Sequence, residues 1–127
     1  MELRSGRSRL SKFVSNNYEQ FELVVVPFPF TDRRATKRRP ALILSDRLAF
    51  NLPIGHSVMA MITTATHTAW PLDVPIRDLR SAGLQVPSIV RMKLFTLDQA
   101  LILKRIGKLA DQDSAAFQNA LRQLFKL

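Results

Sequence analysis

Residues 21–30 read Phe21-Glu22-Leu23-Val24-Val25-Val26-Pro27-Phe28-Pro29-Phe30, and this stretch decides the fold class of the 127-residue chain. β-Branched and aromatic residues favour a strand, and the two prolines are tolerated only where a strand ends or lies at a sheet edge. A polar, strongly basic stretch follows and leads into a second apolar run, Pro40-Ala41-Leu42-Ile43-Leu44-Ser45. The pair predicts a hairpin with a long basic loop.

The rest of the chain continues the β pattern and ends in one helix. Further strands are predicted at 58–63, 70–76, 88–94 and 101–106, and turn signals are found at Asn51, Pro53, Gly55, Gly83 and Pro87. Within 70–76, apolar residues alternate with Pro71, Asp73 and Pro75, which predicts an edge strand.

The C-terminal helix is predicted to start with Asp111 or Asp113 as its cap. Apolar residues then recur at helical spacing, namely Ala116, Phe117, Ala120, Leu121, Leu124 and Phe125. Such a helix would cover one face of the sheet. Short strands followed by one terminal helix predict a mainly β domain of the α+β class, a small SH3-like barrel, and not alternating βα units.

The length fits a single domain, which we place at residues 21–127. Residues 1–20 contain four basic side chains among Ser, Gly and Asn, without the apolar segment of a secretory signal. They are interpreted as a flexible basic N-terminal extension. Contact with a polyanion and the absence of any role both remain open for it.

Charge and composition limit the partners and the reactive groups that this chain can have. The chain has 19 Lys and Arg against 10 Asp and Glu, a formal net charge of +9, which favours polyanionic partners. Cysteine is absent, so disulfides and thiolate chemistry are excluded, and two histidines do not supply a usual zinc site. We therefore expect no metal and no cofactor. The apolar runs are too short to span a bilayer, and a soluble cytoplasmic protein without a membrane partner is expected.

Several motifs occur together in one order. The strings Val26-Pro27-Phe28-Pro29-Phe30-Thr31-Asp32 and Lys37-Arg38-Arg39-Pro40-Ala41-Leu42-Ile43-Leu44-Ser45-Asp46 resemble the opening hairpin of MazF/PemK-like toxins. The resemblance continues through Ala60-Met61-Ile62-Thr63-Thr64, Trp70-Pro71-Leu72-Asp73-Val74-Pro75-Ile76, Pro87-Ser88-Ile89-Val90-Arg91 and Lys93-Leu94-Phe95-Thr96-Leu97-Asp98. It covers roughly Phe21 to the end of the chain.

The resemblance implies a toxin of a type II toxin-antitoxin system with a barrel of the MazF/PemK/CcdB type. Such a toxin is an endoribonuclease, an mRNA interferase, that cuts single-stranded mRNA without metal and leaves a 2′,3′-cyclic phosphate and a 5′-hydroxyl. The implied partners are single-stranded RNA, a second copy in a homodimer and an acidic cognate antitoxin, with operator DNA bound only through the antitoxin.

The resemblance also implies catalytic residues. Attack of a 2′-hydroxyl on phosphorus needs proton transfer and donors aimed at the phosphate oxygens, and the planar fork of arginine suits that charge. Arg39, directly before Pro40, matches the family's arginine. Thr63 matches the second position, and Thr64 remains an alternative for it. Arg91 falls where part of the family has a further active-site arginine.

RNA binding is expected from a basic loop and from polar and aromatic neighbours of the catalytic positions. Dense positive charge suits an RNA backbone, and aromatic rings stack on bases. The predicted RNA-binding residues are Arg33, Arg34, Lys37, Arg38, Thr64, His67, Trp70 and Lys93. Phe28 and Phe30 are further candidates for stacking. A solvated loop is the alternative for the basic residues, and core or dimer packing is the alternative for the aromatic ones.

The chain departs from the family in three places. Lys93 stands where some members have a carboxylate two residues after the arginine, the basic loop has Ala35-Thr36 in place of glycine, and Phe21-Glu22 replaces an opening Gly-Asp. Three other readings therefore stay open: a non-enzymatic nucleic-acid-binding module or a toxin inhibiting a protein such as a topoisomerase, an inactive relative, and a mechanism that uses His56 and His67 as acid and base.

Overall fold

The computed structural model describes residues 18–30, 37–66 and 68–127. Residues 1–17 of the predicted extension, and the predicted RNA-binding residues Arg33, Arg34 and His67, lie outside this part of the chain. Within it, no helix combines the length and the apolar character that crossing a bilayer requires.

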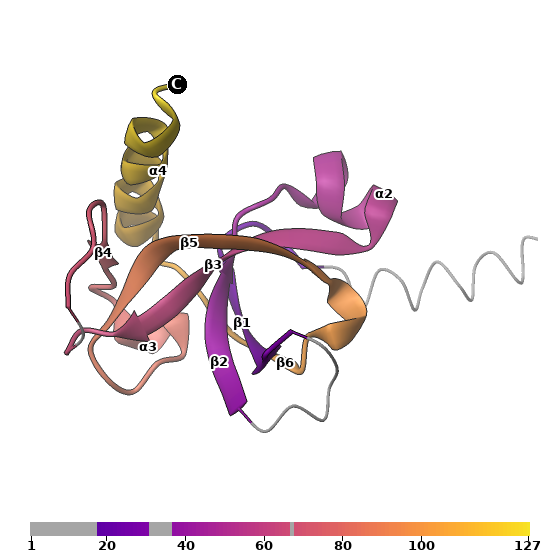
Figure 1. Ribbon diagram of the computed structural model, residues 1–127, viewed down its shortest axis with the longest axis horizontal. Coiled ribbons are helices and arrows are strands. Elements are labelled where there is room, and N and C mark those ends of the chain that lie inside the picture. Colours follow the sequence, from indigo (N-terminus) through magenta and orange to yellow (C-terminus); the bar gives the residue numbers. More distant parts are fainter. Residues whose placement is uncertain (1–17, 31–36, 67) are drawn as a thin grey trace, which may run out of the picture.

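The described residues form a mainly β fold with one long C-terminal helix, and the predicted fold class is confirmed. A single antiparallel sheet in the order β4-β5-β3-β2-β1-β6 curls into a half-barrel (Figure 1). Its strands are β1 (Glu22–Phe28), β2 (Lys37–Ile43), β3 (His56–Thr64), β4 (Val74–Pro75), β5 (Ser88–Asp98) and β6 (Lys104–Lys108). The helices are α2 (Leu52–Ile54), α3 (Leu79–Ala82) and α4 (Asp111–Phe125), with a π-helical turn at Arg47–Asn51 and a 3-10 turn at Gln99–Leu101.

The sheet buries apolar side chains on both faces, because successive residues of a strand point to opposite sides. One cluster contains Leu23, Leu42, Ala60, Ile62 and Val90, which pack with Phe117 of α4. The other contains their strand neighbours Val24, Val26, Ala41, Ile43 and Met59, with Leu97 and Ile102. The near-continuous apolar runs of the sequence reflect this burial on two faces.

Three predicted segments differ from the structure. The strand predicted at 101–106 is displaced, because Leu101 ends a 3-10 turn and the paired strand β6 covers Lys104–Lys108. Only Val74–Pro75 of the predicted strand 70–76 pairs in the sheet, because residues 70–73 form a turn in which Asp73 N–H donates to the Trp70 carbonyl at 3.3 Å. The predicted turn at 51–55 is helical, and it ends at Gly55, whose φ of 72° is left-handed. Helix α3 was not predicted, although Gly83, which ends it in the left-handed conformation, was identified as a turn signal.

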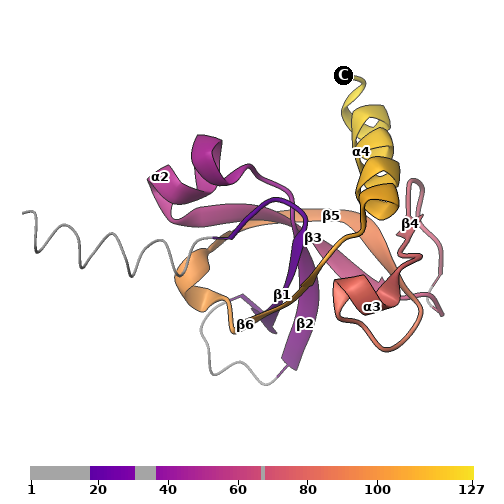
Figure 2. The same ribbon diagram turned by 180° about the vertical axis from the view of Figure 1, so that it is seen from behind.

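Helix α4 follows the prediction in length but not at its cap. Its N-cap is Ala110, and the buried carboxylate of Asp113 instead accepts hydrogen bonds from the backbone of Arg77 and Asp78 at 3.0 and 2.9 Å. Phe117 is fully buried, whereas Phe125 is 55% exposed because the helix extends beyond the barrel (Figures 1 and 2). The last turns of α4 therefore present apolar side chains to solvent.

The ordered fold includes residues before Phe21. Tyr18 is buried, its backbone carbonyl accepts from Asn51 Nδ2 at 2.7 Å, and its N–H donates to Gln99 Oε1 at 3.1 Å. Residues 18–20, which we assigned to the extension, thus belong to the packed domain. Phe21 itself has a φ of 70°, the left-handed region that favours glycine, which explains why a Gly-Asp opening would suit this position.

Candidate functional site

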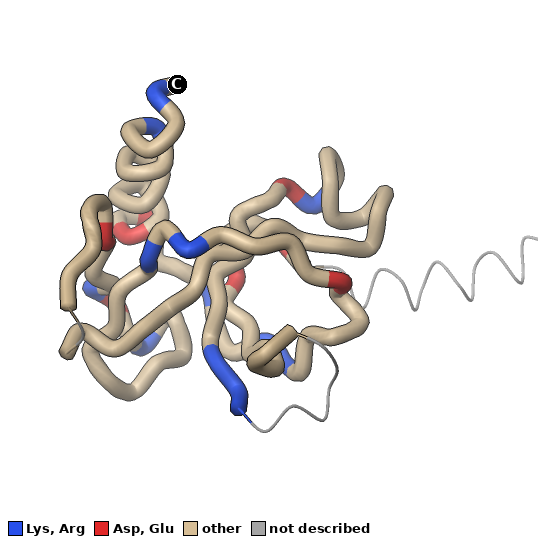
Figure 3. Tube along the Cα trace, in the orientation of Figure 1, with Lys and Arg blue, Asp and Glu red and all other residues tan. Residues whose placement is uncertain are grey.

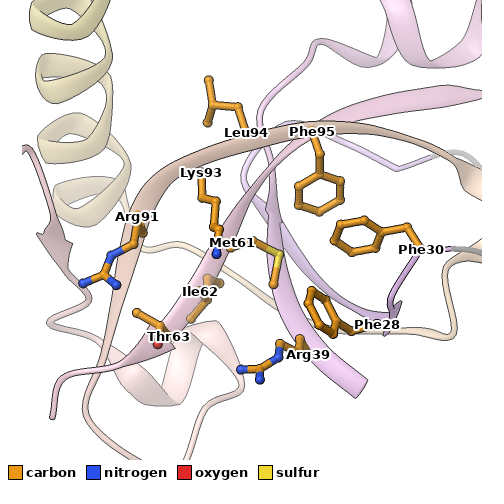
Figure 4. A pocket seen from close by; sticks show the side chains of 10 residues that line it. All are labelled: Phe28, Phe30, Arg39, Met61, Ile62, Thr63, Arg91, Lys93, Leu94 and Phe95. Atoms are coloured by element: carbon orange, nitrogen blue, oxygen red, sulfur yellow. The ribbon is translucent and has the colours of Figure 1, made fainter. Parts of the chain in front are cut away.

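A cavity of about 350 Å³ opens on one face of the sheet, between the ends of β1 and β2 and the middle of β5 (Figure 4). We call it the β2–β5 cavity. Aromatic and aliphatic side chains form one part of its wall, and cationic and hydroxyl side chains form the other. Its lining residues are Phe28, Phe30, Arg39, Met61, Ile62, Thr63, Arg91, Lys93, Leu94 and Phe95.

Strand register brings Arg39 and Thr63 together. β2 and β3 pair antiparallel with Ala41 opposite Met61, and two residues further along the strands stand Arg39 and Thr63. Residues two apart on a strand share a face, so both side chains lie on the face of Ala41 and Met61. Figure 4 shows the Arg39 guanidinium directed toward the Thr63 side of the cavity.

Among the described residues, the guanidinium of Arg39 contacts an aromatic ring and pairs with no acid. Its carbon lies 5.2 Å from the centre of the Phe28 ring, a cation–π contact. Phe28 in turn meets Phe30 edge to face, and Phe30 stacks on Phe95 at 4.3 Å. No carboxylate among the described residues pairs with Arg39. Its hydrogen-bond donors therefore face the cavity without a competing protein anion in this part of the chain.

A bulge in β5 sets the direction of Arg91 and Lys93. Ala60 pairs with Leu94 and Ile62 with Val90, so Arg91, Met92 and Lys93 stand opposite the single residue Met61. Such bulges bend a strand and redirect its side chains. Lys93 is exposed and its Nζ lies 5.8 Å from the centre of the Trp70 ring.

Arg91 makes a bidentate ion pair with Asp73. Its Nε donates to Asp73 Oδ1 at 3.1 Å and its Nη2 to Oδ2 at 2.9 Å, and Nη2 also donates to the Thr68 carbonyl at 2.7 Å. The side chains of Arg91 and Asp73 are 10% and 11% exposed. In Figure 4 the Arg91 head points away from Arg39, toward β4.

The ion pair shifts the pKa of both Asp73 and Arg91. Burial alone raises the pKa of Asp73, but the hydrogen bonds from Arg91 and from the Trp70 backbone, with the charge of Arg91, outweigh it and hold the pKa below its ordinary value. The hydrogen bond to Asp73 raises the pKa of Arg91, against the opposite effect of desolvation. Both groups are therefore charged at neutral pH.

The ion pair gives a testable pH dependence. The pKa of Asp73 is lower in the folded than in the unfolded chain, so the pair contributes stability above the unfolded value of about 3.9 and loses it as the pH falls through the folded pKa. We expect Asp73→Asn to lower the thermal midpoint at pH 7 and to differ less from the wild type as the pH falls below about 4. Thermal unfolding of both proteins over this range is the measurement. A constant difference at all pH values would contradict the assignment.

The structure brings only some of the predicted site residues together. Arg39, Thr63, Arg91 and Lys93 line one cavity, and Trp70, 42% exposed, lies beside it through its contacts with Arg91 and Lys93. Thr64 is exposed, and because it follows Thr63 on the strand it faces the opposite side. Its hydroxyl lies 3.1 Å from that of Thr66.

Lys37 and Arg38 are exposed at the start of β2 and extend the positive charge away from the cavity (Figure 3). Figure 3 also shows the two basic positions of β5 on the neighbouring part of the sheet. Asp73 and Phe95 were not singled out as site residues. Asp73 was visible in the sequence only as a polar member of an alternating segment, and Phe95 only as part of an apolar strand.

The donor set of the cavity is cationic and hydroxylic. The ten described residues that line it include no carboxylate and no imidazole. In the described ranges, no group of three His, Asp or Glu side chains is placed to hold a metal ion. The arrangement suits the binding of an anion that carries an apolar or aromatic group.

Comparison with known families gives a match over residues 19–125, to the family described as PemK-like, MazF-like toxin of type II toxin-antitoxin system. The chain belongs to the PemK/MazF toxin family. The resemblance drawn from the motifs is thereby confirmed. A sequence comparison with curated proteins gave no match.

Solved structures with the same fold include toxins from two bacterial groups. A MazE-MazF crystal structure from Deinococcus radiodurans matches with a TM-score of 0.67 and 18% identity, covering 87% of this chain and 97% of that one. An endoribonuclease in complex with its cognate antitoxin from a mycobacterial species matches with a TM-score of 0.68, 16% identity and coverage of 87% and 96%. The Mycobacterium tuberculosis toxin MazF-mt6 matches with a TM-score of 0.65, 24% identity and coverage of 84% and 97%. These likenesses show that the chain has the fold of PemK/MazF toxins.

Proposed function

We propose that this PemK/MazF-family toxin is a metal-independent endoribonuclease that cuts single-stranded mRNA in the β2–β5 cavity. The observation that carries the proposal is the guanidinium of Arg39, which has no acidic partner among the described residues. It lies beside Thr63 in a cavity whose described lining contains no carboxylate. A scissile phosphate supplies the anion that this group lacks. The wall formed by the contacting rings of Phe28, Phe30 and Phe95 suits a base attached to that phosphate.

The chemistry follows from these donors. The 2′-oxygen loses its proton and attacks the neighbouring phosphorus, while the bond from phosphorus to the 5′-oxygen breaks and that oxygen takes up a proton. The products are a 2′,3′-cyclic phosphate and a 5′-hydroxyl, with no net change in protons. Arg39 binds two of the oxygens on which negative charge accumulates, and the Thr63 hydroxyl donates to the phosphate.

The RNA backbone on either side of the cut needs further cations. Lys93 lies at the cavity, and Lys37 and Arg38 extend the positive surface along β2. Contacts of this kind do not depend on base sequence and weaken with salt. Arg33, Arg34, Thr64 and His67 remain proposed contacts on the sequence alone.

Protein partners follow from the family and from one exposed surface. The Deinococcus MazF and the mycobacterial endoribonuclease were each solved with an antitoxin, and we propose an acidic cognate antitoxin for this chain, which would cover the same cationic cavity and link the toxin to operator DNA.

A homodimer in the cytoplasm is the proposed toxin form. The apolar end of α4 is available to such an interface, because Leu124, Phe125 and Leu127 are 39%, 55% and 90% exposed.

The proposal predicts a definite product. Incubation of the purified protein with single-stranded RNA in EDTA is expected to give fragments that end in a 2′,3′-cyclic phosphate and begin with a 5′-hydroxyl. Mass spectrometry of the fragments and sequencing of their ends would identify both termini. RNA that is bound but stays intact would favour a binding module, and cleavage that EDTA abolishes would argue for metal chemistry.

A further inference from the structure

The arrangement around Trp70 points to a function for its exposed ring. Arg91 covers one side of the ring, with its guanidinium carbon 4.8 Å from the ring centre, and Lys93 lies near it at 5.8 Å. The residue is nevertheless 42% exposed. An indole that contacts two cations and is still partly open to solvent beside an anion-binding cavity is a suitable platform for a nucleobase.

Asp73 forms hydrogen bonds both to the backbone of Trp70 and to the arginine that covers its ring. Its Oδ2 accepts the backbone N–H of Trp70 at 2.8 Å as well as Nη2 of Arg91 at 2.9 Å, and its Oδ1 accepts Nε of Arg91. Arg91 in turn holds the carbonyl of Thr68. One carboxylate and one guanidinium thus secure the loop before and after Trp70 to β5.

These contacts also occupy Arg91. Its Nε and Nη2 donate to Asp73 and Thr68, its flat face lies against Trp70, and its side chain is only 10% exposed. The bonds to Asp73 and Thr68 use the donors on Nε and Nη2, and the carboxylate offsets the positive charge, so Arg91 attracts a phosphate less strongly than an arginine without an acidic partner does. Arg39, by contrast, has no acid partner among the described residues.

We propose that Asp73 is a positioning residue that acts through Arg91 to hold Trp70 as a stacking platform for one nucleobase of the single-stranded RNA, next to the phosphate bound by Arg39. The proposal rests on the proposed function. It assigns Arg91 to holding the platform and leaves Arg39 and Lys93 to contact the RNA phosphates.

The proposal makes a prediction opposite in sign to that of simple electrostatics. Asp73→Asn removes a negative charge beside a site for a polyanion, and charge alone would make RNA bind more tightly. If Asp73 positions Trp70, the same substitution instead weakens binding roughly tenfold, the scale of one lost stacking contact. Asp111→Asn, which removes a charge at the start of α4, is the matched control and should leave the Kd within about twofold.

The experiment uses 2′-O-methyl RNA, a mixed-sequence single strand that cannot be cleaved because it has no free 2′-hydroxyl. Trp70 is the only tryptophan of the chain, so intrinsic fluorescence reports on this one ring. We expect the oligomer to quench it in the wild type, an abasic strand with the same backbone to leave it unquenched, and Asp73→Asn to show weaker binding and less quenching at saturation. With cleavable RNA, Asp73→Asn should raise KM more than it lowers kcat.

A second pair of variants tests the ring itself. Because Trp70 is 42% exposed, its substitution should not prevent folding. Anisotropy of a labelled 2′-O-methyl strand should give a Kd roughly tenfold higher for Trp70→Ala and close to the wild type for Trp70→Phe, which keeps a stacking face. Tighter or unchanged binding by folded Asp73→Asn, or equal losses in the two Trp70 variants, would overturn the proposal. If the wild-type protein cuts RNA but these effects are missing, only the proposal for Trp70 and Asp73 fails. If RNA quenches the Trp70 fluorescence but is not cut, only the endoribonuclease proposal fails.

Discussion

Replacing Arg39 with alanine is expected to slow RNA cleavage by about 10²–10³-fold, the usual cost of removing one donor to the charge of a transition state. Arg39 is only partly buried and its described partner is the ring of Phe28, so the fold should survive the substitution. Single-turnover rates at saturating protein measure the effect on chemistry apart from binding. An unchanged thermal midpoint would show that the loss is not due to unfolding.

The neighbouring arginine provides the matched control. Arg38 carries the same charge, is exposed and points to the opposite side of β2. Arg38→Ala should weaken binding in a salt-dependent way and leave the single-turnover rate within about threefold. Arg39→Lys should fall between the wild type and alanine, because an ammonium keeps the charge but cannot hold two phosphate oxygens as a fork. Full activity of Arg39→Ala in EDTA would remove Arg39 from the chemistry.

The strands that the sequence predicts well are those buried in the sheet. β1, β2, β3 and β5 appear as apolar runs of strand length, because both faces of the curled sheet are covered. Residues 70–76 were assigned to one strand because apolar and polar residues alternate along them, but side chains that face a core do not require strand pairing. Leu72, Val74 and Ile76 pack into or against the core, whereas Trp70 is exposed beside two cations and Asp73 closes a turn.

Short helical segments escaped prediction for a related reason. The turn before β3 is held by a buried polar side chain, Asn51, whose Nδ2 donates to the carbonyls of Tyr18 and Ser45. These contacts join residues 33 and 6 positions apart, which no local pattern records. The same contact explains why the packed domain begins before Phe21.

In the candidate site, too, some features could be predicted from the sequence and others depend on contacts between distant residues. Arg39 and Thr63 could be paired from motifs alone, and the register of β2 and β3 gives a physical reason why these positions act together. The engagement of Arg91 could not be foreseen, since its partner Asp73 lies 18 residues earlier and the bulge in β5 is visible only in the strand pairing. A charged residue in a motif can therefore be identified from sequence, whereas its availability to a ligand depends on the fold.

A close backbone contact between α3 and β6 gives the largest expected effect on stability. Gly83 at the end of α3 and Gly107 in β6 approach each other's chain segments so closely that no side chain fits. A Cβ on Gly107 would lie 2.4 Å from the carbonyl carbon and oxygen of Ala82, and a Cβ on Gly83 would lie 1.9 Å from the carbonyl oxygen of Ile106. Real Cβ atoms do not approach backbone atoms at these distances.

Gly107→Ala is therefore expected to lower the free energy of unfolding by about 3 kcal/mol or more, because rigid backbone and not a flexible side chain must move. Gly83→Ala should cost at least as much, since Gly83 also has a φ of 77°, which adds about 1–2 kcal/mol for a residue with a Cβ. The double variant should cost less than the sum, because one displacement of α3 from β6 relieves both contacts. Urea unfolding measures all three, with the exposed Gln85→Ala as a control within about 0.5 kcal/mol of the wild type. A loss below about 1 kcal/mol for Gly107→Ala would show that α3 can shift at little cost and that this contact does not hold it against β6.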